Sequence, residues 1–441
     1  MQGGINMNKV QPKILPGFME LLPLDQILFN EMYDTIRSIY ERYGFLPLDT
    51  PTIELSEVLL AKAGGETEQQ IYRFNKGDND LSLRFDLTVP LARYVAMNYN
   101  DLVFPFKRYQ MSKVFRGERN QRGRFREFYQ CDIDVIGNES LDTIYDAEMP
   151  AIIYEIFSKL DIGNFTIRIS NRKILKGLIN SLGLNNPADI LRIIDKILKI
   201  GEASVKEELL KLGLTKNDID AIMNLVLITG NPESVIKQLT ALNIDNDLYK
   251  EGLNELIVVV DGLNSFGIKD RYKIDMTLVR GLDYYTGTVY ETILDDYPEL
   301  GSICGGGRYE DLATYYTDQK LPGIGISIGL TRLFFQLKDA NIIKSDCNSA
   351  IKVLVIPFDK NSVSYSLNIS SQLRNANINT DMYYIDNGIK QKLKYANRLN
   401  IPYVIIIGDE ELKEKKVTLK DMISGEQEKL TIDEAINKLT T

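Results

Sequence analysis

Residues 114–137 combine a run of arginines with a strand that carries polar side chains on one face. Two apolar runs with a period of two flank a loop, which predicts a strand, a basic loop and a returning strand. Guanidinium groups bind phosphate oxygens through paired hydrogen bonds, so the loop is a candidate site for a phosphate-bearing ligand. Its arginines are Arg116, Arg119, Arg122, Arg124 and Arg126.

The returning strand places Gln130, Asp132 and Asp134 on one face, because side chains alternate along a strand. The positions between them, Cys131 and Ile133, fall on the other face. A carboxylate that faces inward is costly unless it meets a donor. Together the loop and the strand indicate a nucleotide and a small polar ligand bound side by side. A charged hairpin exposed to solvent is the alternative for this stretch alone.

The composition is that of a soluble globular protein, with 44% hydrophobic and 26% charged residues in a chain of 441. That length predicts two or three domains. No apolar run approaches the roughly 20 residues that span a bilayer, and MQGGINMNKV lacks the apolar segment of a secretory signal. Three widely spaced cysteines match no metal-binding spacing and indicate reduced thiols in a cytoplasmic protein.

The net charge of −9 argues against general nucleic-acid binding but leaves room for a local basic surface. Residues 107–126 contain eight basic residues and one acid, Glu118. We expect this cluster to hold ATP or an RNA end.

The chain contains no histidine, which excludes imidazole general bases, Ser-His-Asp triads and His-ligated zinc.

Four stretches carry a resemblance to a known family. FRGE, followed by Arg124 and Phe128 at an RxxxF spacing, resembles motif 2 of class II aminoacyl-tRNA synthetases, and GIGISIGLTRLF (residues 323–334) is similar to motif 3. LVRGLDYYTGTVYE (residues 278–291) and ICGGGRYEDL (residues 303–312) look like the two histidine-site motifs of histidyl-tRNA synthetases. The resemblance runs from about residue 12 to the C-terminus and implies a histidine–tRNA ligase.

Such a ligase activates its amino acid by attack of a carboxylate on the α-phosphate of ATP. Two anions must meet, so cations must surround the reacting phosphate, and positioning with charge stabilisation does most of the work. The reaction needs no side-chain nucleophile, which suits a chain without histidine.

The resemblance implies a role for each residue of the nucleotide site. Arg116 would bind the α-phosphate and the substrate carboxylate, and Arg280 would approach the α-phosphate from the other side. Arg332 would hold the γ-phosphate and stack on adenine opposite Phe128. Mg²⁺ is implied with ATP, without assigned ligands. Two further residues would complete the nucleotide contacts: Glu118 and Arg124.

The resemblance also implies a histidine pocket. Asp86, Thr88 and Gln130 match residues that hold the α-amino group, while Arg116 and Arg280 face the carboxylate. Asp134 stands where many family members carry Glu, which shortens its reach to the imidazole by one methylene. The residues matching the imidazole contacts and the pocket lining are Asp134, Tyr285, Tyr284 and Tyr309. The residues expected to face the acceptor end of tRNA(His) are Arg119, Gln121 and Arg122.

The expected fold is an α+β catalytic domain built on an antiparallel sheet, with a helical insertion and a C-terminal α/β anticodon-binding domain. We assign the catalytic domain to residues 1–170 and 266–345, the insertion to 171–265 and the anticodon-binding domain to 350–441. A helix over 24–43 followed by an extended segment over 45–55 resembles motif 1, which forms the homodimer interface in the family.

Local patterns add three expectations. Alternation over 81–88 predicts a strand that points Asp86 and Thr88 the same way, followed by a helix over 91–99. The glycines at 305–307 lack the GxxxxGK[ST] spacing of a phosphate loop. We expect them to let the backbone approach a ligand or form a bulge. Alternating β and α patterns over 351–407 predict a small, mainly parallel sheet.

Two other functions compete with the ligase. One is a catalytically silent paralogue that binds histidine and regulates ATP phosphoribosyltransferase, and the other is a sensor of uncharged tRNA. Three explanations for the absence of histidine also stay open: translation when charged histidyl-tRNA is scarce, compositional drift in an AT-rich genome, and design.

Overall fold

The computed structural model describes residues 10–61, 66–119, 123–279, 285–310, 312–344 and 349–440. The chain divides into two compact units, one of residues 1–20 with 31–343 and one of residues 21–30 with 344–441. Among the described residues, no helix is long and apolar enough to cross a membrane.

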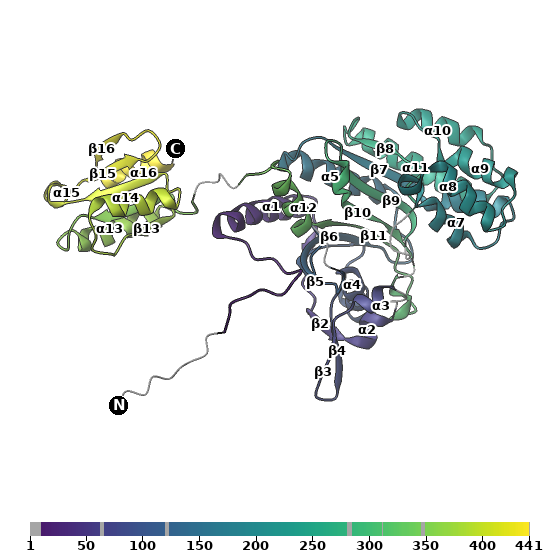
Figure 1. Cartoon of the computed structure of the whole chain (residues 1–441), viewed down its shortest axis with the longest axis horizontal. Helices are drawn as coiled ribbons and strands as arrows, with labels where there is room; N and C mark the ends of the chain where they lie inside the picture. Colours follow the sequence, from purple (N-terminus) through teal and green to yellow (C-terminus); the bar gives the residue numbers. More distant parts are fainter. Residues whose placement is uncertain are drawn as a thin grey trace. The chain divides into compact units, whose positions relative to one another are not determined.

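The first unit is built on a sheet with eight strands in the described part of the chain, in the order β1-β5-β6-β11-β10-β9-β7-β8 (Figure 1). Neighbouring strands are antiparallel except at the two edges, where β1 runs parallel to β5 and β8 parallel to β7. The strands are β1 (Leu46–Pro47), β5 (Phe106–Phe115), β6 (Glu127–Ile136), β7 (Phe165–Asn171), β8 (Tyr272–Ile274), β9 (Tyr285–Leu294), β10 (Ser302–Tyr309) and β11 (Gly323–Gly329).

One face of this sheet is apolar and packs against α5 (Ile144–Leu160). In β6, Cys131 and Ile133 lie opposite Ile328 and Ile326 of β11, and all four are buried. Arg308 of β10 points to the same side, where it meets helix α5. The opposite face carries the polar positions of β6, so strand alternation separates the hydrophobic core from the polar surface.

The long helix α1 (Pro23–Arg42) contacts the strands through tyrosine hydroxyls in its C-terminal half. Tyr40 donates to the carbonyl oxygen of Cys131 at 2.9 Å, and Tyr33 donates to that of Met111 at 3.1 Å. The helix predicted over 24–43 is therefore present with nearly the expected bounds.

A three-stranded sheet, β2 (Ile53–Leu55), β4 (Asn79–Leu83) and β3 (Arg73–Lys76), precedes β5 in the chain. The short helices α2 (Ser56–Leu60) and α3 (Glu66–Gln70) connect β2 to β3. The strand predicted over 81–88 is wrong at its C-terminal end, because β4 stops at Leu83 and α4 (Thr88–Met97) already begins at Thr88. Asp86 accepts from the backbone N–H of Val89 at 3.1 Å and so satisfies a donor in the first turn of α4.

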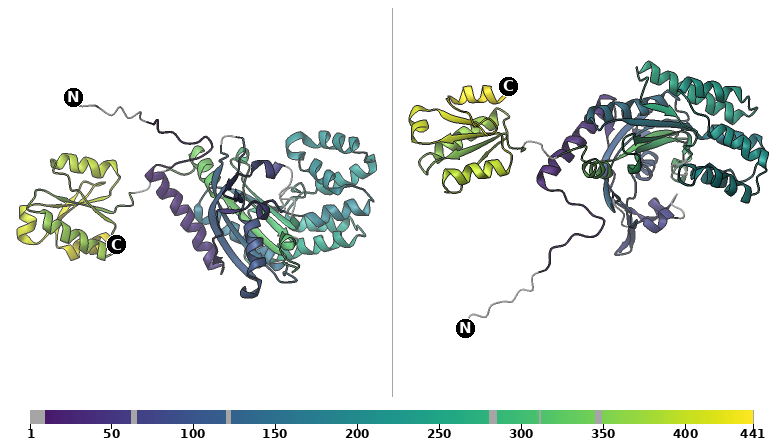
Figure 2. Two further views of the ribbon diagram at one scale, coloured as in Figure 1. Left: turned by 90° about the horizontal axis from the view of Figure 1, so that it is seen from below. Right: turned by 45° about the horizontal axis from the view of Figure 1, so that its top comes forward.

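Residues 172–265 are mostly helical and lie at the β7–β8 side of the sheet (Figure 1, Figure 2). Asparagine or threonine side chains cap several of these helices, including α9, where Thr215 and Asp218 form a capping box. Gly252 of α11 lies so close to α6 that an added Cβ would be 2.7 Å from Lys173 Cβ. The helices are α6 (Arg172–Ser181), α7 (Pro187–Ile194), α8 (Ile197–Lys211), α9 (Lys216–Val226), α10 (Pro232–Ala241) and α11 (Asp247–Ser265).

The glycines of β10 and β11 bring neighbouring backbones close together. A Cβ at Gly306 would be 2.1 Å from the carbonyl oxygen of Gly325, and one at Gly307 would be 2.7 Å from that of Thr288. The register with β9 shifts on both sides of this run, as a β-bulge does. Strand-to-strand packing therefore requires these glycines.

After β11, the chain continues directly into α12 (Leu330–Asp339), the predicted order of strand and helix.

The second unit contains a five-stranded sheet in the described residues, in the order β13-β12-β14-β15-β16. Strands β13 (Thr380–Met382), β12 (Val353–Pro357) and β14 (Tyr403–Ile407) are parallel, as the alternating pattern predicts. Strands β15 (Val417–Asp421) and β16 (Gln427–Leu430) add an antiparallel hairpin that the pattern did not predict. The helices are α13 (Val363–Asn375), α14 (Ile389–Arg398), α15 (Asp409–Glu414) and α16 (Ile432–Thr440).

The ion pair between Arg308 and Asp146 ties the sheet to α5 and generates a stability prediction. Both side chains are at most 5% exposed, and Arg308 also donates to the carbonyl oxygens of Leu141 and Asp142 at 3.0 Å. Asp146→Ala leaves a buried guanidinium without its partner, so we expect the free energy of unfolding of this unit to fall by about 3–5 kcal/mol. Urea unfolding followed by far-UV circular dichroism measures the loss.

The matched control is Asp34→Ala, which breaks a solvent-exposed pair with Arg37 and should change the urea midpoint little. Equal losses in the two variants would contradict the assignment of Asp146 as a buried anchor.

Candidate active site

Two adjoining cavities lie along the polar face of the sheet. They share Arg116, Gln130 and Ser327, so a ligand in one lies beside a ligand in the other. The first, here called the arginine cavity, is lined by Arg116, Glu118, Gly123, Arg124, Phe125, Phe128, Gln130, Ser302, Ile303, Cys304, Gly305, Ser327, Gly329, Arg332 and Leu333. The second, here called the carboxylate cavity, is lined by Asp86, Thr88, Arg116, Gln130, Asp132, Asp134, Tyr285, Tyr309, Gly325, Ile326 and Ser327.

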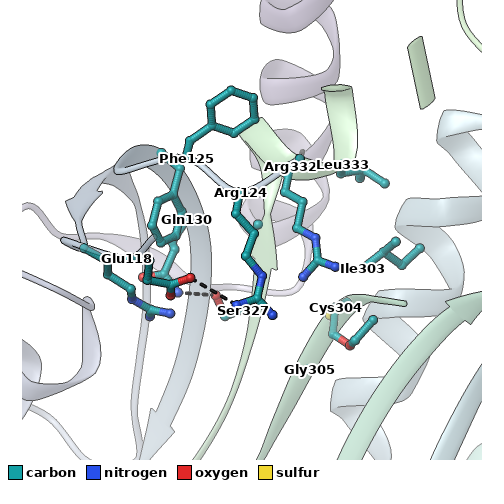
Figure 3. A pocket seen from close by; sticks show the side chains of 15 residues that line it. Glu118, Arg124, Phe125, Gln130, Ile303, Cys304, Gly305, Ser327, Arg332 and Leu333 are labelled. Carbon is teal, nitrogen blue, oxygen red and sulfur yellow. Dashed lines mark hydrogen bonds and ion pairs between the residues drawn. The ribbon is translucent and has the colours of Figure 1, made fainter. Parts of the chain in front are cut away.

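The arginine cavity gathers guanidinium groups from three segments of the chain. Arg116 follows β5, Arg124 precedes β6, and Arg332 lies in the first turn of α12. Figure 3 shows the side chains of Arg124 and Arg332 pointing into the same space. Positive charge from several directions suits a ligand with more than one phosphate group.

Contacts within the cavity hold these side chains in place. The Arg116 guanidinium lies over the Phe128 ring at 5.2 Å, and its Nε donates to the carbonyl oxygen of Phe85 at 2.9 Å. Arg124 pairs with Glu118 at 3.2 Å (Figure 3). Every residue predicted for the nucleotide site that the structure describes therefore lines one cavity.

Asp134, which lines the carboxylate cavity, belongs to an ion pair that the sequence did not predict. Arg108 of β5 lies opposite Asp134 of β6, and the two side chains meet at 2.5 Å. The Tyr309 hydroxyl donates to the other Asp134 oxygen at 2.8 Å. Burial raises the pKa of the Tyr309 phenol well above its usual value, which keeps it a donor. These two contacts fix the Asp134 carboxylate at the wall of the cavity.

Burial governs the ionisation of the acids in this cavity. It raises the pKa of Asp134 to about 6, although Arg108 and Tyr309 act in the opposite direction. It raises the pKa of Asp132 to about 7, against the attraction of Arg108. Burial also raises the pKa of Asp86, which hydrogen bonds from the start of α4 partly oppose. The cavity therefore holds acids whose charge responds to a cationic ligand near neutral pH.

The glycine at position 325 makes room for this arrangement. An added Cβ there would lie 2.2 Å from an Asp134 carboxylate oxygen. The strand register places Gly325 directly opposite Asp134. Only a glycine there leaves enough space for the Asp134 carboxylate.

The basic cluster over 107–126 does not act as one surface, which corrects the sequence interpretation. Arg108 is fully buried against Asp134, Lys107 pairs with Glu148 at 2.8 Å, and Lys113 pairs with Glu127 at 2.7 Å. Of the described residues in this cluster, Arg116 and Arg124 are the basic residues that line the arginine cavity. Composition does not distinguish Arg108 from the other basic residues of the cluster. Its partner is revealed by the β5–β6 register, which places Arg108 opposite Asp134.

One predicted residue lines neither cavity, and four fall outside the residues that the structure describes. Arg119 is exposed in the loop between β5 and β6. Four others lie outside the described residues: Arg280, Tyr284, Gln121 and Arg122. Ser327 was not predicted, and its small side chain in a glycine-rich strand offers no pattern that marks it as functional.

Comparisons with known proteins identify the family. A model described as histidyl-tRNA synthetase matches residues 17–333, and one described as anticodon binding domain matches residues 352–441. A histidine–tRNA ligase of Clostridium tetani is 59% identical, covering 97% of this chain and 98% of its own length. One of Finegoldia magna is 46% identical, covering 98% of this chain and 100% of its own length.

Solved structures give the same result. Histidyl-tRNA synthetase from Nostoc sp. superposes with a TM-score of 0.91 at 41% identity, covering 98% of this chain and 99% of its own. A protein from Bacillus halodurans, titled as an ATP phosphoribosyltransferase regulatory subunit/histidyl-tRNA synthetase, shares the fold with a TM-score of 0.75 at 21% identity, covering 90% of this chain and 99% of its own. The chain therefore belongs to the histidyl-tRNA synthetase family of aminoacyl-tRNA ligases.

Proposed function

We propose that this chain activates histidine with ATP and transfers it to the 3′-terminal adenosine of tRNA(His). The observation that carries the proposal is the pair of cavities that meet at Arg116. A histidine carboxylate oxygen attacks the α-phosphorus, the bond to the β-phosphate oxygen breaks, and pyrophosphate leaves. The terminal ribose hydroxyl then attacks the acyl carbon, and AMP leaves.

The arginine cavity is the proposed ATP site. Arg116 binds the α-phosphate at the junction with the amino acid, where charge develops during attack. Arg332 holds the γ-phosphate and stacks with Phe128 across adenine, while Glu118 and Arg124 complete the contacts. We assign Arg280, by resemblance, to the other side of the α-phosphate.

Mg²⁺ is proposed to enter as part of the ATP complex. No group of three or more acids or thiols suited to a metal lies among the described residues. Mg²⁺ commonly keeps several waters and binds substrate phosphates with only one or two carboxylates. Glu118 supplies a carboxylate in the arginine cavity.

The carboxylate cavity is the proposed histidine site. Arg108 and Tyr309 hold Asp134 so that it accepts a hydrogen bond from one imidazole nitrogen, and the Tyr285 hydroxyl faces the other nitrogen. Tyr284 is proposed to line the pocket. Asp86, Thr88 and Gln130 face the α-amino group, and Arg116 and Arg280 face the carboxylate. A side chain that left these buried groups unpaired would be strongly rejected.

The tRNA is proposed to contact both units. Arg119, Gln121 and Arg122 face the acceptor end, where arginines give affinity through phosphate contacts. In the second unit, Phe358 and Tyr384 are 58% and 68% exposed. They follow β12 and β13 at the same edge of the parallel sheet, where aromatic rings can stack on anticodon bases.

Assembly as a homodimer is supported by apolar side chains on the motif 1 segment. Leu46, Ile53 and Leu55 are 60%, 47% and 43% exposed. Exposed apolar residues gathered in one segment mark a surface that a partner covers.

A cytoplasmic location is supported by the free thiols of Cys131 and Cys304 and by the substrates ATP and tRNA.

The curated relatives support the ligase over the alternative function, a regulatory paralogue. Such a protein would bind histidine without turning over ATP. The presence of Arg116, Arg280 and Arg332 in the sequence, together with the second unit, favours the enzyme.

Replacing Asp134 should separate the histidine site from the ATP site. We expect Asp134→Asn to lower the free energy of unfolding, because the buried Arg108 loses its charged partner. In the folded fraction, the KM for histidine should rise about 10- to 100-fold, because a hydrogen bond to a charged group is worth about 1.5–3 kcal/mol, and the KM for ATP should change little. Pyrophosphate exchange into ATP measures both constants. The exposed acid Asp318 provides the control Asp318→Asn, and equal weakening of both substrates would refute the assignment.

Replacing the exposed aromatic residues should separate tRNA binding from activation. We expect Phe358→Ala and Tyr384→Ala each to raise the KM for tRNA about 5-fold or more, because stacking on a base is worth about 1–3 kcal/mol. Pyrophosphate exchange, which needs no tRNA, should stay unchanged.

The control is Ile423→Ala, which removes an apolar side chain that is 84% exposed in the same unit. An unchanged KM for tRNA in both aromatic variants would rule out this surface.

A further inference from the structure

Asp132 is a buried acid of the carboxylate cavity to which no role has been assigned above. It lies between Gln130 and Asp134 on the polar face of β6 and is 2% exposed. The register places it opposite Ser327 of β11 and Gln110 of β5. Its position follows from the same alternation that brings its two neighbours to the cavity.

A chain of hydrogen bonds orients Asp132 and Gln130. The Gln130 amide Nε2 donates to the Ser327 hydroxyl at 2.8 Å (Figure 3). The Ser327 hydroxyl is hydrogen-bonded in turn to the Asp132 carboxylate. A serine has one proton to donate, and the ionised carboxylate only accepts, so the serine oxygen takes its hydrogen bond from the Gln130 NH₂ group. The Gln130 Oε1 is left as an acceptor.

Three buried acceptor oxygens of this cavity have no partner among the residues that the structure describes. They are Asp86 Oδ2, Gln130 Oε1 and Asp132 Oδ1. Their side chains are all at least nine-tenths buried. A buried acceptor without a donor costs free energy, so a ligand that brings donors to this position is favoured.

The charges around the cavity identify the donor. Arg108 is paired with Asp134, and Arg116 lies at the junction with the arginine cavity. Asp86 and Asp132 have no cation of their own within hydrogen-bond distance among the described side chains. A primary ammonium group carries one positive charge and three N–H donors, which match the three acceptors in number.

We propose that Asp132 is a specificity-determining residue that accepts a hydrogen bond from the α-ammonium group of the substrate, together with Asp86 and Gln130. The inference rests on the proposed histidine site and deepens it. Asp132 makes the enzyme select amino acids over imidazole compounds that lack the ammonium group. Ser327 is a positioning residue, because it acts through Asp132 and Gln130.

The ionisation of Asp132 supplies a second readout. The charged and polar groups around it are Arg108 and Gln110 from β5, Gln130 and Asp134 from β6, Asp86 from the segment before α4 and Ser327 from β11. Because burial raises its pKa to about 7, the carboxyl titrates in the neutral range in the free enzyme. An ammonium ligand binds the ionised form, so its affinity should rise between pH 6 and pH 8. This contribution disappears in Asp132→Asn.

The test compares three ligands on the full chain by isothermal titration calorimetry. Histidine has both groups, histidinol keeps the ammonium but lacks the carboxylate, and imidazole-propionate lacks the ammonium. Asp132→Asn should weaken histidine and histidinol about 10- to 100-fold, the effect of losing a hydrogen bond to a charged group. Imidazole-propionate should bind the variant within about twofold of the unmodified enzyme.

Two outcomes overturn the inference. Either histidine binds Asp132→Asn as tightly as the unmodified enzyme, or imidazole-propionate is weakened as much as histidine, which would place Asp132 against the ring or in the fold. Asp318→Asn is the control for loss of an acid elsewhere.

A second variant covers the case in which Asp132→Asn does not fold. Ser327→Ala removes the hydroxyl that orients both acceptors and should weaken histidine and histidinol by about 3- to 10-fold, again without affecting imidazole-propionate. Equal effects on all three ligands would also overturn the inference. Failure of the unmodified enzyme to activate histidine would instead reject the proposed function, so the two failures are distinguishable.

Discussion

The buried ion pair between Arg108 and Asp134 is the interaction on which the rest of the site depends. Its two side chains are 0% and 4% exposed, and each is costly to bury without the other. The pair forms because β5 and β6 run antiparallel in a register that places the two residues opposite each other. The loop between those strands supplies Arg116 and Arg124 of the neighbouring cavity, and α12 supplies Arg332. One strand pairing therefore builds both parts of the site.

The sheet can carry this charge because its two faces are chemically separate. The apolar face packs on α5 and supplies the core, while the polar face keeps its acids away from that core. Glycines in β10 and β11 let the strands approach closely and leave room for the Asp134 carboxylate. A small ligand can then be surrounded by strand side chains, which are held more rigidly than loop residues.

The parts of the fold with strong periodicity were predictable from sequence. The spacing of apolar residues predicts these elements, and tertiary contacts do not override it there. They are the helix α1, the strands β5 and β6, the helical segment over 172–265 and the step from β11 into α12. The predicted end of β4 was wrong. The apolar alternation continues past Leu83, but the strand stops there and Asp86 accepts a hydrogen bond from the first turn of α4. Arg108 was counted with the phosphate-binding cluster, because only the strand register reveals its partner. Strand alternation placed Asp132 on the polar face, but its unpaired Oδ1 and its hydrogen bond to Ser327 appear only in the structure.

Pyrophosphate exchange into ATP with each standard amino acid in turn tests the central claim most directly. We expect exchange with histidine alone, because the carboxylate cavity offers an imidazole acceptor at Asp134 beside the proposed ATP site at Arg116. Absence of exchange with every amino acid, despite measurable histidine binding, would contradict the account and favour a regulatory histidine-binding protein.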